Sequence, residues 1–134
     1  MIVVIDTNIW VMAISPRSRY HLIYEQFVVG NFSIVLSNAI VFEYREILIK
    51  KDSAETSDAF FSLIGWLPNV YQVEPPYSLK LIPSDPDDDK FVDAVVRELA
   101  DFIVTEDAHF QVLKNIAFPL VAVKGIDEFL ELIH

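Results

Sequence analysis

The sequence predicts a three-layer α/β/α fold with a mostly parallel central sheet of about five strands. Short apolar runs rich in β-branched residues alternate with longer runs of helical periodicity along the whole chain. This alternation is typical of crossover connections around a parallel sheet. The 134 residues show no internal repeat, low-complexity tract or linker. We therefore expect one domain that spans residues 1–134 and buries a core of its own.

The first half of the chain is expected to hold two strands and three helices. The apolar run at residues 1–14 has no basic leader, so we interpret it as a buried strand, β-rich at residues 1–6, and not as a signal peptide. Ser37 has the character of a helix N-cap, and Lys50 and Lys51 suit the C-terminal end of that helix dipole. The second strand is expected at 32–37, and helices are expected at 19–31, 37–51 and 53–68.

The second half continues the alternation after a proline-rich loop at residues 75–86. The preceding helix should stop at Pro68, since proline lacks the amide proton that a helix interior needs. Strands are expected at 69–74, within 101–107 and at 118–123, and helices at 87–100, 108–115 and 126–133.

Acidic residues outnumber basic ones, with twenty Asp and Glu against ten Lys and Arg and a net charge of -10. This excess opposes non-specific binding to nucleic acid and is compatible with a basic protein partner or with a site that collects metal cations. The chain has no cysteine, which excludes thiolate metal sites and fits a reducing cytoplasm. Because no run of about 18 apolar residues occurs, we expect no membrane span.

Two aspartates follow predicted strands. Asp6 ends the first strand, and Asp107 lies just past the fourth. Open parallel sheets place their sites outside the carboxyl ends of the strands. If these two strands are neighbours, both carboxylates therefore reach the same edge of the sheet. The alternative role for Asp6 is a helix N-cap.

Five aspartates crowd into nine consecutive residues of the second half. Asp85, Asp87 and Asp88 suit the N-cap and first turn of a helix, where negative charge favours the helix dipole. Asp89 and Asp93 lie four residues apart at the edge of the apolar face, where like charges repel each other. They indicate a bound cation or ordered water, with a solvated helix edge as the alternative.

Glu43 borders the apolar face of its predicted helix, with no lysine or arginine at the neighbouring helical positions to pair with it. Together with Asp6, Asp89 and Asp107 it makes a set of acids from four separate segments. Carboxylates and water are the ligands of Mg²⁺ and Mn²⁺, and such a site can activate water and neutralise charge on a phosphodiester. The chain offers only three glycines and no phosphate-binding loop, and its three histidines lack zinc-like spacing.

The segments IDTNIW, the helix with Glu43, DPDDDKFVDAVV and FIVTED, in this order, resemble PIN-domain nucleases over nearly the whole chain. The VapC-like toxins of bacterial toxin–antitoxin pairs are the most similar group. The resemblance implies a parallel sheet between helices, a dimer, and RNA cleavage with bound Mg²⁺ or Mn²⁺. By position it assigns metal binding and catalysis to four acids, Asp6, Glu43, Asp89 and Asp107.

The same resemblance implies supporting roles for other polar residues. Asn8 and Thr105 match residues that steady the first and fourth acids. Relatives often carry a further acid shortly after the fourth, where this chain has Ala108 and His109, so Asp93 is a candidate for that extra carboxylate.

The sequence therefore predicts a cytoplasmic metal-dependent ribonuclease with RNA as substrate and a basic antitoxin as partner. Arg17 and Arg19 are candidates for RNA binding, with an ordinary solvated loop as the alternative. Apolar helices at 20–29 and 54–67 predict a homodimer. Two other functions stay open: a PIN-like binding module without activity, and a phosphoacceptor receiver domain. A receiver domain would need an aspartate at the end of strand three, where the segment NVYQVEPPY has none.

Overall fold

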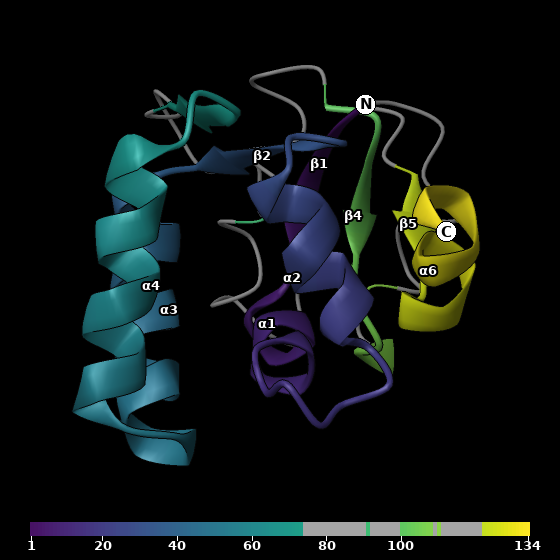
Figure 1. The fold of residues 1–134 in the computed structure, drawn as a ribbon. Helices are drawn as coiled ribbons and strands as arrows, with labels where there is room; N and C mark the ends of the chain where they lie inside the picture. The colour runs from purple at the N-terminus through teal and green to yellow at the C-terminus, as the bar shows by residue number, and fades with distance from the viewer. Residues whose placement is uncertain (74–90, 92–99, 109, 111–121) are drawn as a thin grey trace.

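The computed structural model describes residues 1–73, 91, 100–108, 110 and 122–134 (Figure 1). The described strands are β1 (Ile2–Ile5), β2 (Ser33–Leu36), β3 (Val70–Gln72), β4 (Phe102–Val104) and β5 (Val123–Lys124). The described helices are α1 (Thr7–Ala13), α2 (His21–Val28), α3 (Asn38–Lys51), α4 (Ala54–Trp66) and α6 (Ile126–Ile133). None of these helices is long and apolar enough to cross a membrane.

The five strands form one sheet in the order β3-β2-β1-β4-β5, and every neighbouring pair is parallel. The three-layer α/β/α fold with a parallel sheet of five strands is thereby confirmed. From β1 the chain adds β2 and β3 on one side and returns to add β4 and β5 on the other. The strand order thus reverses between β1 and β4, and open sheets of this kind bind ligands at such a reversal.

β1 lies at the centre of the sheet because its side chains suit burial on both faces. Val3, Val4 and Ile5 are fully buried, as expected for a central parallel strand. In the register with β4, Ile5 lies opposite Val104, and the amide of Asp6 donates to the carbonyl of Val104 at 2.9 Å. The two strands are therefore neighbours, and the residues that follow them leave the sheet together.

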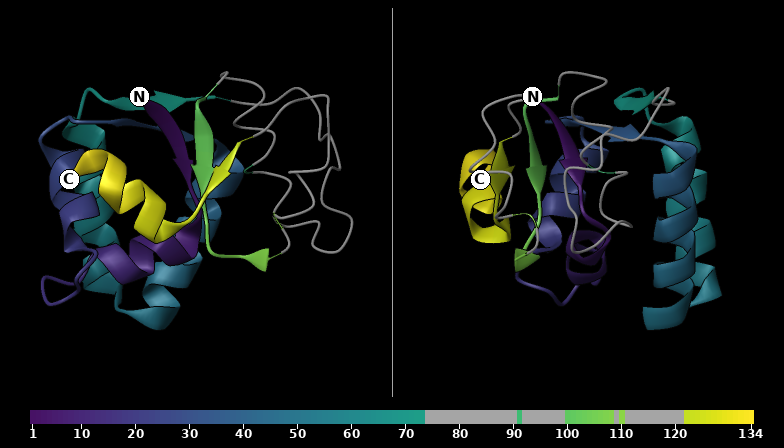
Figure 2. Two further views of the ribbon diagram at one scale, coloured as in Figure 1. Left: turned by 90° about the vertical axis from the view of Figure 1, so that its right-hand side faces the viewer. Right: turned by 180° about the vertical axis from the view of Figure 1, so that it is seen from behind.

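The helices are joined to one another by large buried side chains. Trp10 of α1 is fully buried and packs against Phe27 of α2 and Phe60 of α4, with ring centroids 5.3 and 5.1 Å apart. Figures 1 and 2 show α1, α2 and α6 next to one another over the sheet, with α3 and α4 side by side near β2. Aromatic contacts of this kind add about 0.5–1.5 kcal/mol each beyond their buried area.

The interpretation of residues 1–14 as a single strand is wrong, because residues 7–13 form α1. The buried positions Thr7, Trp10 and Ala13 are three residues apart, which is helical spacing. Ile9 is buried as well, so that more than one side of α1 is covered. A short helix that is apolar on several sides cannot be told from a buried strand by its periodicity.

Other boundaries agree with the sequence. The Ser37 hydroxyl accepts a hydrogen bond from the Ile40 amide at 3.2 Å, so Ser37 is the N-cap of α3 as predicted. α4 ends at Trp66, two residues before Pro68. The predicted helices at 87–100 and 108–115 lie largely outside the described residues, as does most of the predicted strand at 118–123.

Candidate active site

Asp6 occupies the N-cap position of α1, yet its side chain does not cap that helix. Only 6% of the residue is exposed. Its Oδ2 atom accepts a hydrogen bond from the hydroxyl of Thr105, at 2.6 Å. The buried carboxylate therefore points across the sheet edge toward the end of β4, which is the placement that a shared site requires.

Thr105 connects this carboxylate to Asp107, which follows the end of β4. Its hydroxyl donates to Asp6 and accepts from the backbone amide of Asp107 at 3.0 Å. Its own amide donates to the carbonyl of Lys124 on β5 at 2.9 Å, so the residue is tied into the sheet. Thr105 thus fixes the turn that presents Asp107, which is half-buried, beside Asp6.

Glu43 reaches the same region from α3. The hydroxyl of Thr7, the first residue of α1, donates to Oε2 of Glu43. The next residue on α3, Tyr44, is fully buried and donates its hydroxyl to the carbonyl of Ile5. Two consecutive residues of α3 therefore contact the end of β1 and the start of α1, and this arrangement holds Glu43 next to Asp6.

The electrostatics show that these acids act on one another. Burial, which is the largest cause, and the charges of Glu43 and Asp107 together raise the pKa of Asp6 from 3.8 to about 6. The hydrogen bond from Thr105 opposes the rise, because it favours the ionised carboxylate. Asp6 is thus a buried acid in a field of like charge, and a cation would relieve that repulsion.

The donor set suits a hard divalent cation, since it consists of carboxylates at the edge of a sheet. Within the residues that the structure describes, however, no three acidic, histidine or cysteine side chains form a complete metal-binding group. Asp89 and Asp93, the other predicted acids, lie outside the described residues. Asp6, Glu43 and Asp107 are therefore a partial set of ligands, and their metal role remains a prediction.

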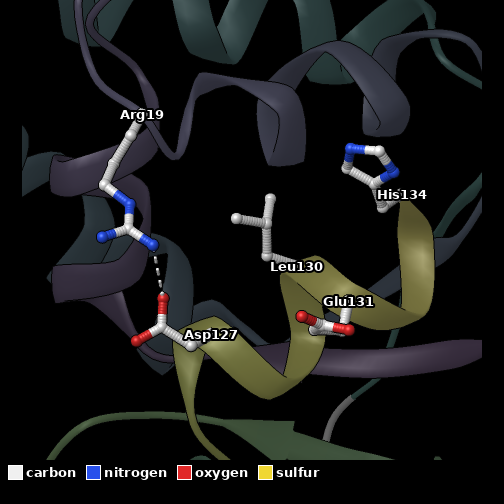
Figure 3. A pocket seen from close by; sticks show the side chains of 5 residues that line it. All are labelled: Arg19, Asp127, Leu130, Glu131 and His134. Carbon is white, nitrogen blue, oxygen red and sulfur yellow. Dashed lines mark hydrogen bonds and ion pairs between the residues drawn. The ribbon is translucent and has the colours of Figure 1, made fainter.

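The other predicted polar residues have varied surroundings. Asn8 is exposed, and its Oδ1 accepts a hydrogen bond from Nζ of Lys51 at 3.0 Å. Arg17 is exposed in the loop after α1. Arg19 forms an ion pair with Asp127 of α6 at 3.2 Å, beside a pocket of about 440 Å³ (Figure 3). The charge of Arg19 is thus already partnered, and an RNA-binding role for either arginine remains a prediction.

Sequence reasoning missed three residues that contact the predicted acids or their neighbours. Thr7 follows Asp6 directly, and that adjacency was the available signal. Tyr44 lies at a position typical of a core residue. Lys51 lies in the last turn of α3, where a positive charge favours the helix dipole. Neither position reveals a contact with the end of β1 or with Asn8, because both contacts join segments far apart in the sequence.

Comparison with known proteins gives a family and a fold. A family model described as a PIN domain matches residues 2–109, a range that contains all four predicted acids. The chain is similar to one in the crystal structure of VapBC2 from Rickettsia felis bound to a DNA fragment from their promoter. That match has a TM-score of 0.59 and 18% identity, and covers 93% of this chain and 98% of the other. A search of curated proteins finds no match.

The raised pKa of Asp6 makes the stability of the metal-free protein depend on pH. Between pH 4 and 6 the folded protein holds a proton on Asp6 that the unfolded chain releases, so stability falls as pH rises through this window. Asp6→Asn cannot ionise and keeps an oxygen for Thr105. We expect it to be more stable than the parent above pH 6, by up to about 3 kcal/mol, with an advantage that shrinks toward pH 4.

Urea unfolding of parent and variant at several pH values, with a metal chelator present, measures this difference. A stability difference between parent and variant that stays constant from pH 4 to pH 7 would contradict the raised pKa of Asp6.

Proposed function

The chain belongs to the PIN-domain family, and from this membership we propose that it is a divalent-metal-dependent ribonuclease. The observation that carries the proposal is the buried Asp6 carboxylate, whose pKa is raised by burial and by the charges of Glu43 and Asp107. A group of acids that repel one another at the carboxyl edge of a parallel sheet serves no structural purpose on its own. It is the arrangement expected where cations bind.

In the proposed site Asp6, Glu43, Asp89 and Asp107 hold Mg²⁺ or Mn²⁺. When bound, the cation supplies positive charge at the scissile phosphate and lowers the pKa of a coordinated water. Asp93 is a candidate for an extra carboxylate at this site, and Thr105 and Asn8 are the supporting residues.

The chain's own residues prepare the site by fixing the acids in place. Thr105 orients Asp6 and the turn to Asp107, and Thr7 orients Glu43. Preorganised groups of this kind do not need to reorganise during the reaction. Without a cation the same carboxylates repel the phosphodiester, so we expect cleavage to depend strictly on divalent metal. No side chain is required as general base in this scheme.

The proposal extends to partners. A chain in the VapBC2 structure of Rickettsia felis is similar in fold to this chain. We propose that this chain is a cytoplasmic toxin with a basic antitoxin, which its net charge of -10 would attract. We also propose a homodimer through the helices at 20–29 and 54–67. Val29 and Trp66, at the ends of α2 and α4, are 68% and 87% exposed, and the proposed dimer would cover both side chains.

A binding module without activity is the second candidate, because the family fold does not by itself require catalysis. The receiver domain is abandoned, since the chain belongs to another family and β3 ends in Gln72.

Glu43→Gln should lower RNA cleavage by about 100-fold or more, because it removes a charge that the proposed site uses to hold metal. Glu46→Gln is the matched control, since Glu46 is an exposed acid three residues further along α3. Single-turnover cleavage of a labelled RNA with Mn²⁺ measures both. Equal rates for the two variants would remove Glu43 from the site, and a parent that binds RNA without cutting it would support the inactive binding module.

Two aspartates at the start of the predicted helix, Asp85 at its N-cap and Asp89 within it, should separate stability from metal binding. Asp85→Ala should lower the free energy of unfolding by about 0.5–2 kcal/mol, as loss of an N-cap does, while cleavage by the folded fraction persists. Asp89→Asn should keep metal-free stability and lose the rise in Tm that millimolar Mn²⁺ gives the parent. Thermal melts with and without Mn²⁺ test both changes. A rise in Tm that survives in Asp89→Asn would exclude Asp89 as a ligand.

Trp66→Ser should shift the protein from dimer to monomer, because it removes the most exposed large apolar side chain of the proposed interface. Phe42→Ser is the control, since Phe42 is 72% exposed on α3, outside the two proposed helices. Light scattering should give the parent and the control twice the chain mass of 15.3 kDa. A parent that stays monomeric at high concentration would refute the dimer.

A further inference from the structure

A lysine is held beside the acidic site. Lys51 is the last residue of α3, and its Nζ donates to Oδ1 of Asn8 at 3.0 Å. Asn8 follows Asp6 by two residues and lies in the first turn of α1. Both side chains are exposed, so the ammonium group faces solvent while the hydrogen bond limits where it can lie.

The position of Lys51 on α3 relates it to Glu43. Lys51 follows Glu43 by eight positions, which is a little over two helical turns, about 12 Å of helix axis and about 80° of rotation. The two residues therefore lie on adjoining sides of the helix. Glu43 contacts Thr7, and Lys51 contacts the next residue, Asn8. The long side chains of both residues therefore end at the start of α1, close to Asp6.

Three other described cations are engaged elsewhere. Arg19 is paired with Asp127, Arg45 lies over the ring of Phe61 at 5.0 Å, and Lys124 lies over that of Phe102 at 5.4 Å. Among the residues that the structure describes, Lys51 forms no ion pair.

The neighbouring acid does not neutralise Lys51 either. Asp52 accepts a hydrogen bond from the hydroxyl of Thr56 at 2.9 Å, which turns it toward α4. Within the described part of the chain, no acid therefore neutralises the charge of Lys51, which can act on an anion that approaches the site.

We propose that Lys51, oriented by Asn8, binds a phosphate of the RNA backbone next to the one that is cleaved. The inference rests on the proposed ribonuclease function and adds a substrate contact to it. A chain with a net charge of -10 repels nucleic acid overall, so a cation fixed beside the acids is needed to hold the strand there. Lysine binds phosphate as a point charge, and such contacts position a strand without reading its sequence.

Lys50 provides a control within the same helix turn. It is exposed and lies equally close to the C-terminal end of α3, so it contributes to the helix dipole as Lys51 does. The structure records a hydrogen bond to Asn8 from Lys51 alone. A role limited to the dipole predicts the same effect for both lysines, whereas phosphate binding at the site predicts an effect for Lys51 only.

The test measures binding of a labelled single-stranded RNA over a range of salt concentrations, in a Glu43→Gln background in which we expect cleavage to be nearly lost. Lys51→Gln should weaken binding by about 10-fold and reduce the salt dependence by about one phosphate contact. Lys50→Gln should stay within about twofold, and Lys51→Arg should restore most of the affinity because it keeps the charge. In the active chain Lys51→Gln should raise KM and leave kcat nearly unchanged.

The outcomes separate the two levels of the proposal. Equal RNA affinity for Lys51→Gln and Lys50→Gln, in a protein that cleaves RNA, overturns the inference alone. A parent chain that neither binds nor cleaves RNA overturns the proposed function, and the inference with it. Thermal melts of both variants should agree within about 2 °C, since each removes one exposed charge, and a large loss of stability in Lys51→Gln alone would make it a structural residue.

Discussion

The hydroxyl of Thr105 joins the two halves of the candidate site. It donates to the carboxylate of Asp6 and accepts from the amide of Asp107, so one side chain fixes the ends of two strands relative to each other. The contact is possible only because β1 and β4 are parallel neighbours in a register that places Ile5 opposite Val104. Asp6 and Thr105 are far apart in the sequence, and they meet where the strand order reverses.

Burial of Asp6 works against stability, and the surrounding structure accommodates it. The carboxylate is almost fully covered and feels the charges of Glu43 and Asp107, so its pKa is raised to about 6. One hydrogen bond from Thr105 offsets part of this effect. The arrangement therefore destabilises the metal-free protein, and strongly shifted pKa values of this kind are common at functional sites.

α3 carries both an acidic and a basic residue near the site, Glu43 and Lys51. The Tyr44 hydroxyl anchors the helix to the backbone of β1, and this anchor places Glu43 against Thr7. At the end of the helix Lys51 meets Asn8. One helix therefore places both Glu43 and Lys51 against the first turn of α1. The helical rise defines the spacing between these two residues.

The sequence by itself determined the fold class, the N-cap of α3 and the C-terminal helix. Each of these depends on residues that are close together in the sequence, namely on alternating strand and helix patterns or on a cap. It also singled out Asp6, Glu43 and Asp107, because acids at predicted strand ends and core edges are visible without a structure. It failed at α1, where an apolar run buried on several sides has no period that distinguishes helix from strand.

Only the tertiary structure decided which side chains meet. The contacts of Thr105 with Asp6, of Thr7 with Glu43 and of Lys51 with Asn8 all join residues at least 36 positions apart. Such contacts depend on the strand order and on the direction in which α3 crosses α1, and local sequence encodes neither. The ion pair of Arg19 with Asp127 is of the same kind, and it is the reason why the arginine that looked available in the sequence is already partnered in the fold.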